Sequence, residues 1–204
     1  IWVGTQSGEL YVVEADSVKA RRVANGSGET PPVTSFVEDG GKRMWVGTSR
    51  GLQLYDALSL APLRRIAHDI RKPSGLAGND VTTLLRDRAG WLWVGGLGLG
   101  LQRHNPENKA IALLAPDPDT RSVYRNPDIR SILQVDNGEV WASMQGDGVV
   151  VFDRTLRATG TVAFATQRIQ PSHRQAGTAQ GAKPLAALPQ ITSMVQRRDG
   201  RVWL

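Results

Sequence analysis

The chain has 204 residues, no cysteine and a formal net charge of +6 at pH 7. The absence of cysteine excludes disulfides, thiolate metal sites and cysteine nucleophiles. The longest apolar runs fall short of the roughly 18 residues that a membrane-spanning helix requires, so we expect no membrane span within this chain. Length alone is compatible with one large domain or with two small ones.

The excess positive charge is concentrated in one part of the chain. Residues 154–188 include five basic residues and no acidic residue, namely Arg154, Arg157, Arg168, Arg174 and Lys183. A basic segment of this kind is typical of a solvated loop, and it is also compatible with an anion-binding patch. It lacks the interspersed aromatic residues on which bases of a single strand stack, so we expect no nucleic-acid partner. We interpret residues 158–188 as a mobile basic insert, and the sequence leaves open whether it binds anything.

Tryptophan recurs at a regular interval, at Trp2, Trp45, Trp93, Trp141 and Trp203. The first four are about 43 to 48 residues apart, which is the period of a unit with four short strands, as in a propeller blade. We therefore divide the chain into units at roughly 1–32, 33–78, 79–125 and 126–188, followed by a partial unit at 189–204, and treat 1–204 as a single propeller segment.

The same series of elements is predicted in each unit. A six-residue run of alternating β-branched and apolar residues comes first, at 33–38, 81–86, 129–134 and 191–196. A tight turn with Asp and Gly follows, at 39–41, 87–90, 136–138 and 199–200. A strand with the tryptophan, a polar or Gly-rich link and a third strand come next, and outer strands are predicted at 61–66 and 109–114. The pattern predicts an all-β propeller of four-stranded antiparallel blades, about four of which are present.

The recurring residues have structural interpretations. We expect Trp45, Trp93, Trp141 and Trp203 to lie between blades, where each would bury about 200 Å² of surface. The glycine of Trp-Val-Gly would let the neighbouring blade approach closely. Trp91 is not part of the repeat, so a role as an aromatic platform for a sugar is more open for it. The recurring turn aspartates, which are Asp39, Asp87, Asp136 and Asp199, indicate turn formation, because a catalytic carboxylate is needed only once.

The repeat resembles the two-component regulator propeller repeat. The similarity rests on Ile-x-Ser-Ile-x-x-Asp-x-x-Gly, then Leu-Trp-Val-Gly-Thr, then Gly-Leu-x-x-Tyr-Asp, and the closest copies are residues 33–56 and 79–105. Single units depart from this pattern: Ala142-Ser143 replaces Gly-Thr, Gly96 replaces Thr, and His104 stands where Tyr is usual. The resemblance covers nearly the whole chain.

The resemblance implies a function and a location. Propellers of this family form the extracytoplasmic, periplasmic sensor region of membrane-bound bacterial histidine kinases or GGDEF-type diguanylate cyclases. They have about seven blades, within the range that propellers span. The chain begins and ends on a tryptophan-bearing strand, so we expect an arc of a larger ring, with the membrane tether outside it. A closed four-bladed ring is the alternative. The expected partners are the other blades, an unknown small molecule or glycan, and a second copy in a homodimer.

Other classes of function remain open. Streptogramin-type lyases share the Trp-centred unit, but their chemistry needs a general base, typically histidine, on the central face. The histidines here, His68, His104 and His173, are not paired with a ligand at i+2 or i+4, so we expect no metal site and no cofactor. A protein-interaction scaffold resembling Trp-Asp-repeat propellers is a third possibility, although the Gly-His and Trp-Asp pairs of that family are missing. We expect a binding module and not an enzyme.

Ligand-binding residues are expected on one face of the propeller. In a propeller, the loops that precede the first strand of each unit meet there around the central opening, together with the links between second and third strands. Arg50 and Arg130 could hold a carboxylate or phosphate by two hydrogen bonds, and an exposed arginine without a partner is the alternative. The expected contacts are Arg50, Asn79, Asp80, Asn126, Arg130, Gln145 and Asp147.

Overall fold

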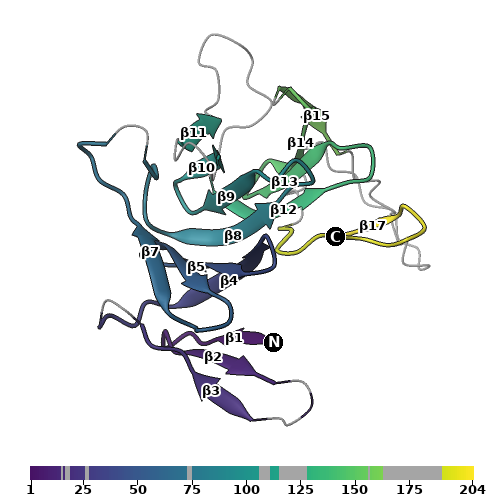
Figure 1. The fold of residues 1–204 in the computed structure, drawn as a ribbon. Coiled ribbons are helices and arrows are strands. Elements are labelled where there is room, and N and C mark those ends of the chain that lie inside the picture. The colour runs from purple at the N-terminus through teal and green to yellow at the C-terminus, as the bar shows by residue number, and fades with distance from the viewer. Residues whose placement is uncertain are drawn as a thin grey trace, which may run out of the picture.

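The structure is a computed structural model, and it describes residues 1–14, 16, 19–25, 28–72, 75–105, 111–114, 128–155, 157–162 and 190–204. These residues form five separate antiparallel sheets, three of which have four strands (Figure 1). Within the described ranges, no helix is long and apolar enough to cross a membrane. The predicted all-β architecture of four-stranded antiparallel blades is confirmed.

Each sheet lies within one of the expected units, and we number the sheets as blades 1 to 5. Blade 1 holds β1 (Trp2–Gly4), β2 (Leu10–Val13) and β3 (Ala20–Arg22). Blade 2 holds β4 (Val33–Asp39), β5 (Arg43–Thr48), β6 (Gly51–Asp56) and β7 (Pro62–Ile66). Blade 3 holds β8 (Val81–Arg86), β9 (Leu92–Gly96), β10 (Gly100–His104) and β11 (Ile111–Leu114). Blade 4 holds β12 (Ile129–Gln134), β13 (Val140–Met144), β14 (Gly148–Phe152) and β15 (Ala158–Thr161), and blade 5 holds β16 (Val195–Gln196) and β17 (Val202–Trp203).

The first strands of successive blades lie next to one another, so β8 contacts both β4 and β12 (Figure 1). Each of these three strands has an irregular register at its second residue, which is Thr34, Thr82 or Arg130. A bulge turns the extra side chain away from its own ladder. The Thr34 hydroxyl donates to the Val81 carbonyl at 2.7 Å, and the Thr82 hydroxyl donates to the Ile129 carbonyl at 2.5 Å. The bulged threonines therefore link one blade to the next.

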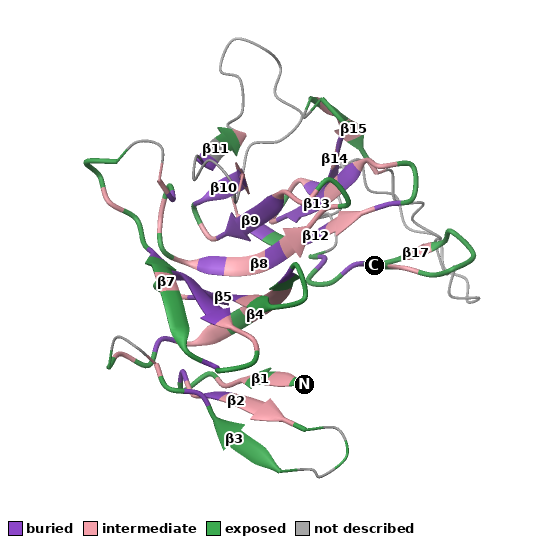
Figure 2. Ribbon diagram, in the orientation of Figure 1, coloured by how far each residue is buried: buried purple, intermediate pink, exposed green. Residues whose placement is uncertain are grey.

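Apolar side chains fill the spaces between blades. Trp45 of β5 packs with Leu84 and Val94 of blade 3, and Trp93 of β9 packs with Ile132 of blade 4. Figure 2 shows that burial is concentrated in β5 and β9, whereas the outer strands β3 and β7 are mainly exposed. Burial between blades is confirmed for Trp45 and Trp93, because each closes the gap to the following sheet.

The same prediction holds less well for the later tryptophans. Trp141 is half-buried against Ile191 and Met194. Trp203 is 58% exposed, and no described sheet lies on the far side of β17, so its position between blades stays a prediction.

The glycine after each buried tryptophan allows close approach of the next blade, as predicted. A Cβ atom added at Gly95 would lie 2.5 Å from Cγ2 of Ile129, the first residue of blade 4. One added at Gly47 would lie 2.9 Å from Cγ1 of Val81, the first residue of blade 3. Both distances are far shorter than ordinary van der Waals contact, so a side chain at either position would separate the blades.

Two other predictions need correction. The run 191–196 was expected to form a complete first strand, but only Val195–Gln196 pairs, because β17 offers just two partner residues. The basic insert was expected to begin at residue 158, whereas Ala158–Thr161 is β15, the outer strand of blade 4, paired with β14. Residues 163–188 of that insert, which include Arg168, Arg174 and Lys183, lie outside the described residues.

Candidate ligand-binding face

We call the ends of the blades where the first strands begin the loop face. Hydrogen bonds tie the segment before each first strand to the links between second and third strands. The Gly51 amide donates to the Asn79 carbonyl at 2.7 Å, and the Leu97 amide donates to the Asp80 carbonyl at 3.0 Å. The carboxylate of Asp128 accepts from the Gly98 amide at 2.6 Å. The loop face is therefore a continuous hydrogen-bonded surface across blades 2 to 4.

Arg50 projects from the link of blade 2, and its guanidinium already has a partner. Nη1 of Arg50 lies 3.0 Å from Oε1 of Glu29, and Nη2 of Arg65 lies 3.1 Å from Oε2 of the same carboxylate. The Arg50 side chain is exposed, so the pair is screened by water and salt. A ligand carboxylate would therefore compete with Glu29 for this guanidinium.

Asn79 and Asp80 lie together immediately before β8. The side-chain oxygen of Asn79 accepts from the His68 amide at 2.7 Å, while its carbonyl accepts from the amides of Gly51 and Val81. Asn79 therefore links three segments by hydrogen bonds, at His68, Gly51 and Val81, a structural role that the sequence did not reveal. Asp80 is partly buried, and its carbonyl oxygen holds the link of blade 3.

Blade 4 brings two of the predicted residues into direct contact. Arg130 occupies the bulge position at which blades 2 and 3 have a bridging threonine. Its Nη2 donates to Oε1 of Gln145 at 2.7 Å, and the Gln145 amide donates to the Asp128 carbonyl at 3.1 Å. Asp147 lies two residues further along the same link and is partly buried. Of the predicted contacts, Asn126 lies outside the described residues.

The predicted residues thus form separate groups on one face. Arg50 belongs to blade 2, Asn79 and Asp80 to the start of blade 3, and the Arg130–Gln145 pair to blade 4. Among the residues that the structure describes, no group of three or more His, Asp or Glu side chains is arranged to hold a metal ion. What the face offers chemically is therefore a set of hydrogen-bond donors and acceptors.

A cleft at the outer edge lies near this face. A cavity of about 1030 Å³ is lined mainly by residues 64–72, with Gly75 and Ile111. Its positive charge is compensated only in part: the lining includes Arg64, Arg65, Arg71 and Lys72, whereas Asp69 pairs with two of them and Glu29 is shared between Arg65 and Arg50. The hydrogen bonds from Arg71 are the main reason that the pKa of Asp69 lies below its usual value. The cleft is therefore less selective for anions than its composition suggests.

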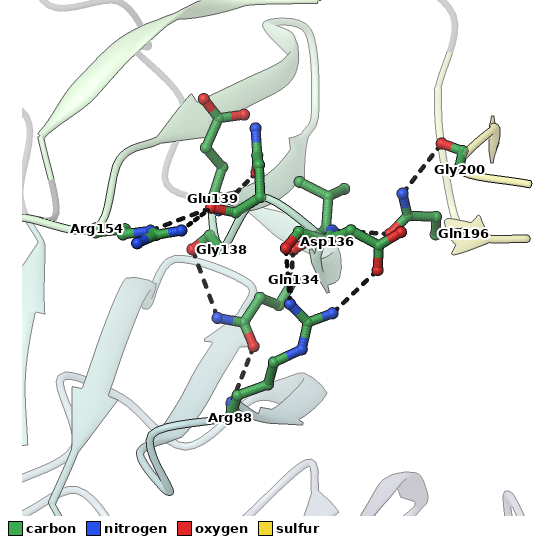
Figure 3. A network of polar contacts seen from close by, with 10 residues as sticks. Arg88, Gln134, Asp136, Gly138, Glu139, Arg154, Gln196 and Gly200 are labelled. Atoms are coloured by element: carbon green, nitrogen blue, oxygen red, sulfur yellow. Dashed lines mark hydrogen bonds and ion pairs between the residues drawn. The ribbon is translucent and has the colours of Figure 1, made fainter. Parts of the chain in front are cut away.

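The opposite ends of the blades carry the hairpins between first and second strands, and we call them the turn face. Figure 3 shows how hydrogen bonds join neighbouring turns. The Arg88 amide donates to Oε1 of Gln134 at 2.9 Å, and the guanidinium of Arg88 binds the carboxylate of Asp136 at 3.1 Å. The Asp136 amide in turn donates to Oε1 of Gln196 at 3.0 Å. These contacts join blades 3, 4 and 5 in series.

Asp39 departs from the turn-forming role expected for it. Its carboxylate is 2% exposed and pairs with the guanidiniums of Arg43, at 2.9 Å, and Arg86 of the next blade. The sequence carried a signal for the second pair that we did not use. Asp39 and Arg86 are separated by 47 residues, as are Thr34 and Val81, which is one residue less than the spacing of 48 between Trp45 and Trp93. A separation close to the blade period therefore indicates which residues meet between blades.

Sheets that stack through their first strands, with tryptophans between them, define a segment of a β-propeller. A family model described as "Two component regulator propeller" matches residues 75–98. The chain therefore contains this repeat, and the resemblance seen in the sequence is confirmed. No curated protein matches the chain.

Solved structures with a similar fold come from B. thetaiotaomicron. The extracellular domain of the putative hybrid two component system BT3049 has a TM-score of 0.66 and 20% identity, over 99% of this chain and 24% of that one. The extracellular domain of the putative one component system BT4673 has a TM-score of 0.54 and 14% identity, over 99% of this chain and 30% of that one. At these identities the likeness shows the fold, and the chain spans less than a third of either length.

Proposed function

We propose that this chain is part of the extracytoplasmic sensor propeller of a membrane-bound bacterial signalling protein. The observation that best supports the proposal is the regulator-propeller match at residues 75–98 in a chain whose fold resembles extracellular domains of signalling systems. The output domain would be a histidine kinase or a diguanylate cyclase, the chain would lie in the periplasm, and the protein would act as a homodimer.

The ligand would bind on the loop face, and its class would be a small molecule or a glycan. Arg130 offers a guanidinium held in place by Gln145, and Asp147 lies in the same link. A ligand shifts a conformational equilibrium only by binding one state more tightly than the other. Because the blades are linked by buried tryptophans and bulged threonines, we expect occupancy to alter how whole propellers associate.

The described histidines favour binding over catalysis. His104 is fully buried, and its ring packs edge-on against Trp45 with the ring centroids 6.1 Å apart. Nδ1 of His68 is within 2.6 Å of the Leu76 carbonyl. Both rings therefore take part in the packing and hydrogen bonding of blades 2 and 3, so neither observation favours a lyase.

The proposal can be tested with the full-length protein in its own membrane. Protease added to intact spheroplasts should cleave within residues 1–204, because the chain would face the periplasm. Protection until the cells are lysed would contradict the location. Output should then respond to an added ligand, and Arg130→Ala should raise the concentration for half-maximal output by about tenfold, the effect of losing one charge-assisted hydrogen bond. Arg88→Ala, on the turn face, should leave that concentration unchanged.

A further inference from the structure

A second cavity opens on the turn face, between the hairpins of blades 2 and 3. It has a volume of about 320 Å³ and is lined by Asp39, Arg43, Arg86, Ala89, Gly90, Trp91 and Asn105. This volume is at the lower end of the range for small-molecule sites, which are about 300–1,000 Å³. The cavity therefore suits a ligand of one ring, and it is distinct from the loop face.

The cavity presents two guanidiniums held by one buried carboxylate. Oδ1 of Asp39 accepts a hydrogen bond from Arg86, and Oδ2 forms an ion pair with Nη2 of Arg43 at 2.9 Å, so the charged lining residues comprise two cations and one anion. The turns lie close to the guanidinium of Arg86: Cβ atoms added at Gly40 and Gly90 would lie 3.8 Å and 3.5 Å from its terminal nitrogens, which is ordinary contact. Arg43, Arg86 and Asp39 together carry a net charge of +1, which an anionic ligand would neutralise. Asp39 already orients both guanidiniums, so less conformational freedom is lost on binding.

An ion pair between blades does not by itself account for this arrangement. One guanidinium would be enough to pair with Asp39, as Arg88 alone pairs with Asp136 between blades 3 and 4. In addition, the indole nitrogen of Trp45, six residues after Asp39, is buried and has no hydrogen-bond partner among the described residues. The equivalent indole of blade 3 donates to Asp87 at 2.8 Å. The carboxylate of blade 2 thus binds two arginines while a nearby donor stays unsatisfied.

The wall next to the arginines is aromatic and fixed in position. Trp91 lines the cavity, and the guanidinium carbon of Arg103 lies 3.9 Å from the centroid of its ring. Burial lowers the pKa of Arg103, which the charge of Asp87 partly opposes. A cation on the indole face holds the ring in place. Asn105 supplies an amide at the same wall.

We propose that this cavity binds a small organic acid, with its carboxylate on Arg43 and Arg86 and its ring against Trp91. A guanidinium recognises a carboxylate through two parallel hydrogen bonds, and an indole provides a flat apolar surface for a ring. This proposal does not depend on the sensor role or on ligand binding at the loop face. Evidence against the cavity would therefore leave the proposed function unaffected.

Isothermal titration of the full chain tests the site with two probes, benzoate and D-glucuronate, which place a carboxylate on an aromatic and on a saturated ring. Benzyl alcohol and D-glucose are the neutral counterparts. At least one acid should bind saturably, and its neutral counterpart should bind at least tenfold more weakly. Arg43→Gln should weaken binding of the acid by about tenfold or more, because it removes one charge-assisted contact.

Arg88→Gln is the matched control, since it makes the same change of charge on the same face outside the cavity. It should change the affinity by less than about twofold, the expectation for a distant exposed charge. Arg43 is exposed and Arg86 still pairs with Asp39, so we expect Arg43→Gln to fold, which thermal melting checks. Saturable binding of neither acid, equal binding of acid and neutral counterpart, or unchanged affinity in Arg43→Gln would each overturn the site.

Discussion

Blades 2 and 3 use the same residue in two different ways. Asp39 and Asp87 occupy the same position, six residues before the buried tryptophan of each blade. Asp87 accepts from the indole nitrogen of Trp93 at 2.8 Å and from the Trp91 amide at 2.9 Å, so it completes its own hairpin. Asp39 binds Arg43 and Arg86, and the indole nitrogen of Trp45 has no partner within the described part of the chain.

The difference shows that successive blades share the same backbone fold, whereas equivalent polar side chains have different partners in different blades. Blade 4 is a third solution, because Glu139 accepts from the indole of Trp141 at 3.4 Å. Leaving a buried donor unpaired costs about 1–3 kcal/mol. We therefore take the arginine cluster, formed by Asp39 and Arg43 of blade 2 and Arg86 of blade 3, as the place where the repeat departs from the most stable local arrangement, as functional sites commonly do.

The largest expected effect comes from removing a buried indole. Trp93→Ala should lower the free energy of unfolding by about 3–5 kcal/mol, because it empties the space between blades 3 and 4. Trp45→Ala should be less destabilising by about 1–2 kcal/mol, since it also removes an unpaired donor. Urea unfolding measures both. Trp203→Ala is the control, and a loss there as large as at Trp93 would contradict the packing described for the exposed β17.

Adding one methyl group next to each tryptophan should have a smaller effect. At Gly95 the new Cβ would contact Ile129 and Thr83, which are branched side chains on first strands. At Gly47 the nearest atom is the hydroxyl oxygen of Ser35, which can rotate away, and Cγ1 of Val81 in the next blade lies at 2.9 Å, compared with 2.5 Å for Ile129 at Gly95. Gly95→Ala should therefore be destabilising by about 1–3 kcal/mol, and Gly47→Ala by less.

The control for these two variants is Gly160→Ala in β15, where a Cβ would have nothing within 4 Å. Thermal unfolding of the three variants gives the order directly. If Gly160→Ala lowered the melting temperature as much as Gly95→Ala, close approach of the blades would not be the reason for glycine at position 95.

Substituting Asp39 and Asp87 one at a time should distinguish the two arrangements, because the resulting losses of stability should depend differently on salt concentration. Asp87→Asn weakens the charge-assisted hydrogen bonds that the neutral N–H groups of Trp91 and Trp93 donate to the carboxylate, so we expect a loss of about 1–2 kcal/mol. Only the interaction with Arg103 makes this loss depend on salt, so the dependence should be weak. Asp39→Asn leaves two guanidiniums facing each other, so its loss should be larger at low salt and shrink as salt screens their repulsion. Unfolding at several salt concentrations checks this, and equal salt dependence would argue against a charged cluster.

The smallest expected effect is at the exposed link between blades 3 and 4. Arg88→Gln breaks a pair with Asp136 in which both side chains are well exposed, so the loss should be at most about 1 kcal/mol. Chemical denaturation is sufficient to measure it. A loss above about 2 kcal/mol would mean that the turn-face network of Figure 3 contributes more than screened surface pairs usually do.

Much of the architecture was predictable from the spacing of the tryptophans. The period of 48 residues identified the blades, and Trp-Val-Gly identified where neighbouring sheets approach most closely. Whether Trp203 is covered was not predictable from the motif, because burial depends on a neighbouring sheet and the motif describes only the strand that carries the tryptophan. The short pairing of 195–196 has the same cause.

The loop face was less predictable than the blades. The sequence indicated which segments meet there, yet it did not show that Glu29 pairs with Arg50 or that the Asn79 side chain accepts a hydrogen bond from the His68 backbone amide. Both partners come from irregular loops, whose paths no periodicity encodes. The arginine cluster on the turn face was missed because Asp39 matched the turn pattern, and only a separation of 47 residues, close to the blade period of 48, connects it with Arg86.

The most direct test of the account is the pair of variants Trp45→Phe and Trp93→Phe, compared by urea unfolding. Both remove the indole nitrogen and keep an aromatic ring, so the loss of packing is matched. Trp93→Phe breaks the hydrogen bond to Asp87, whereas Trp45→Phe removes a donor that has no partner in the described structure. We predict that Trp93→Phe is more destabilising than Trp45→Phe by about 1–2 kcal/mol. Equal losses in the free energy of unfolding, or a larger loss at Trp45, would contradict the claim that Asp39 pairs with the arginines whereas Asp87 accepts hydrogen bonds within its own blade.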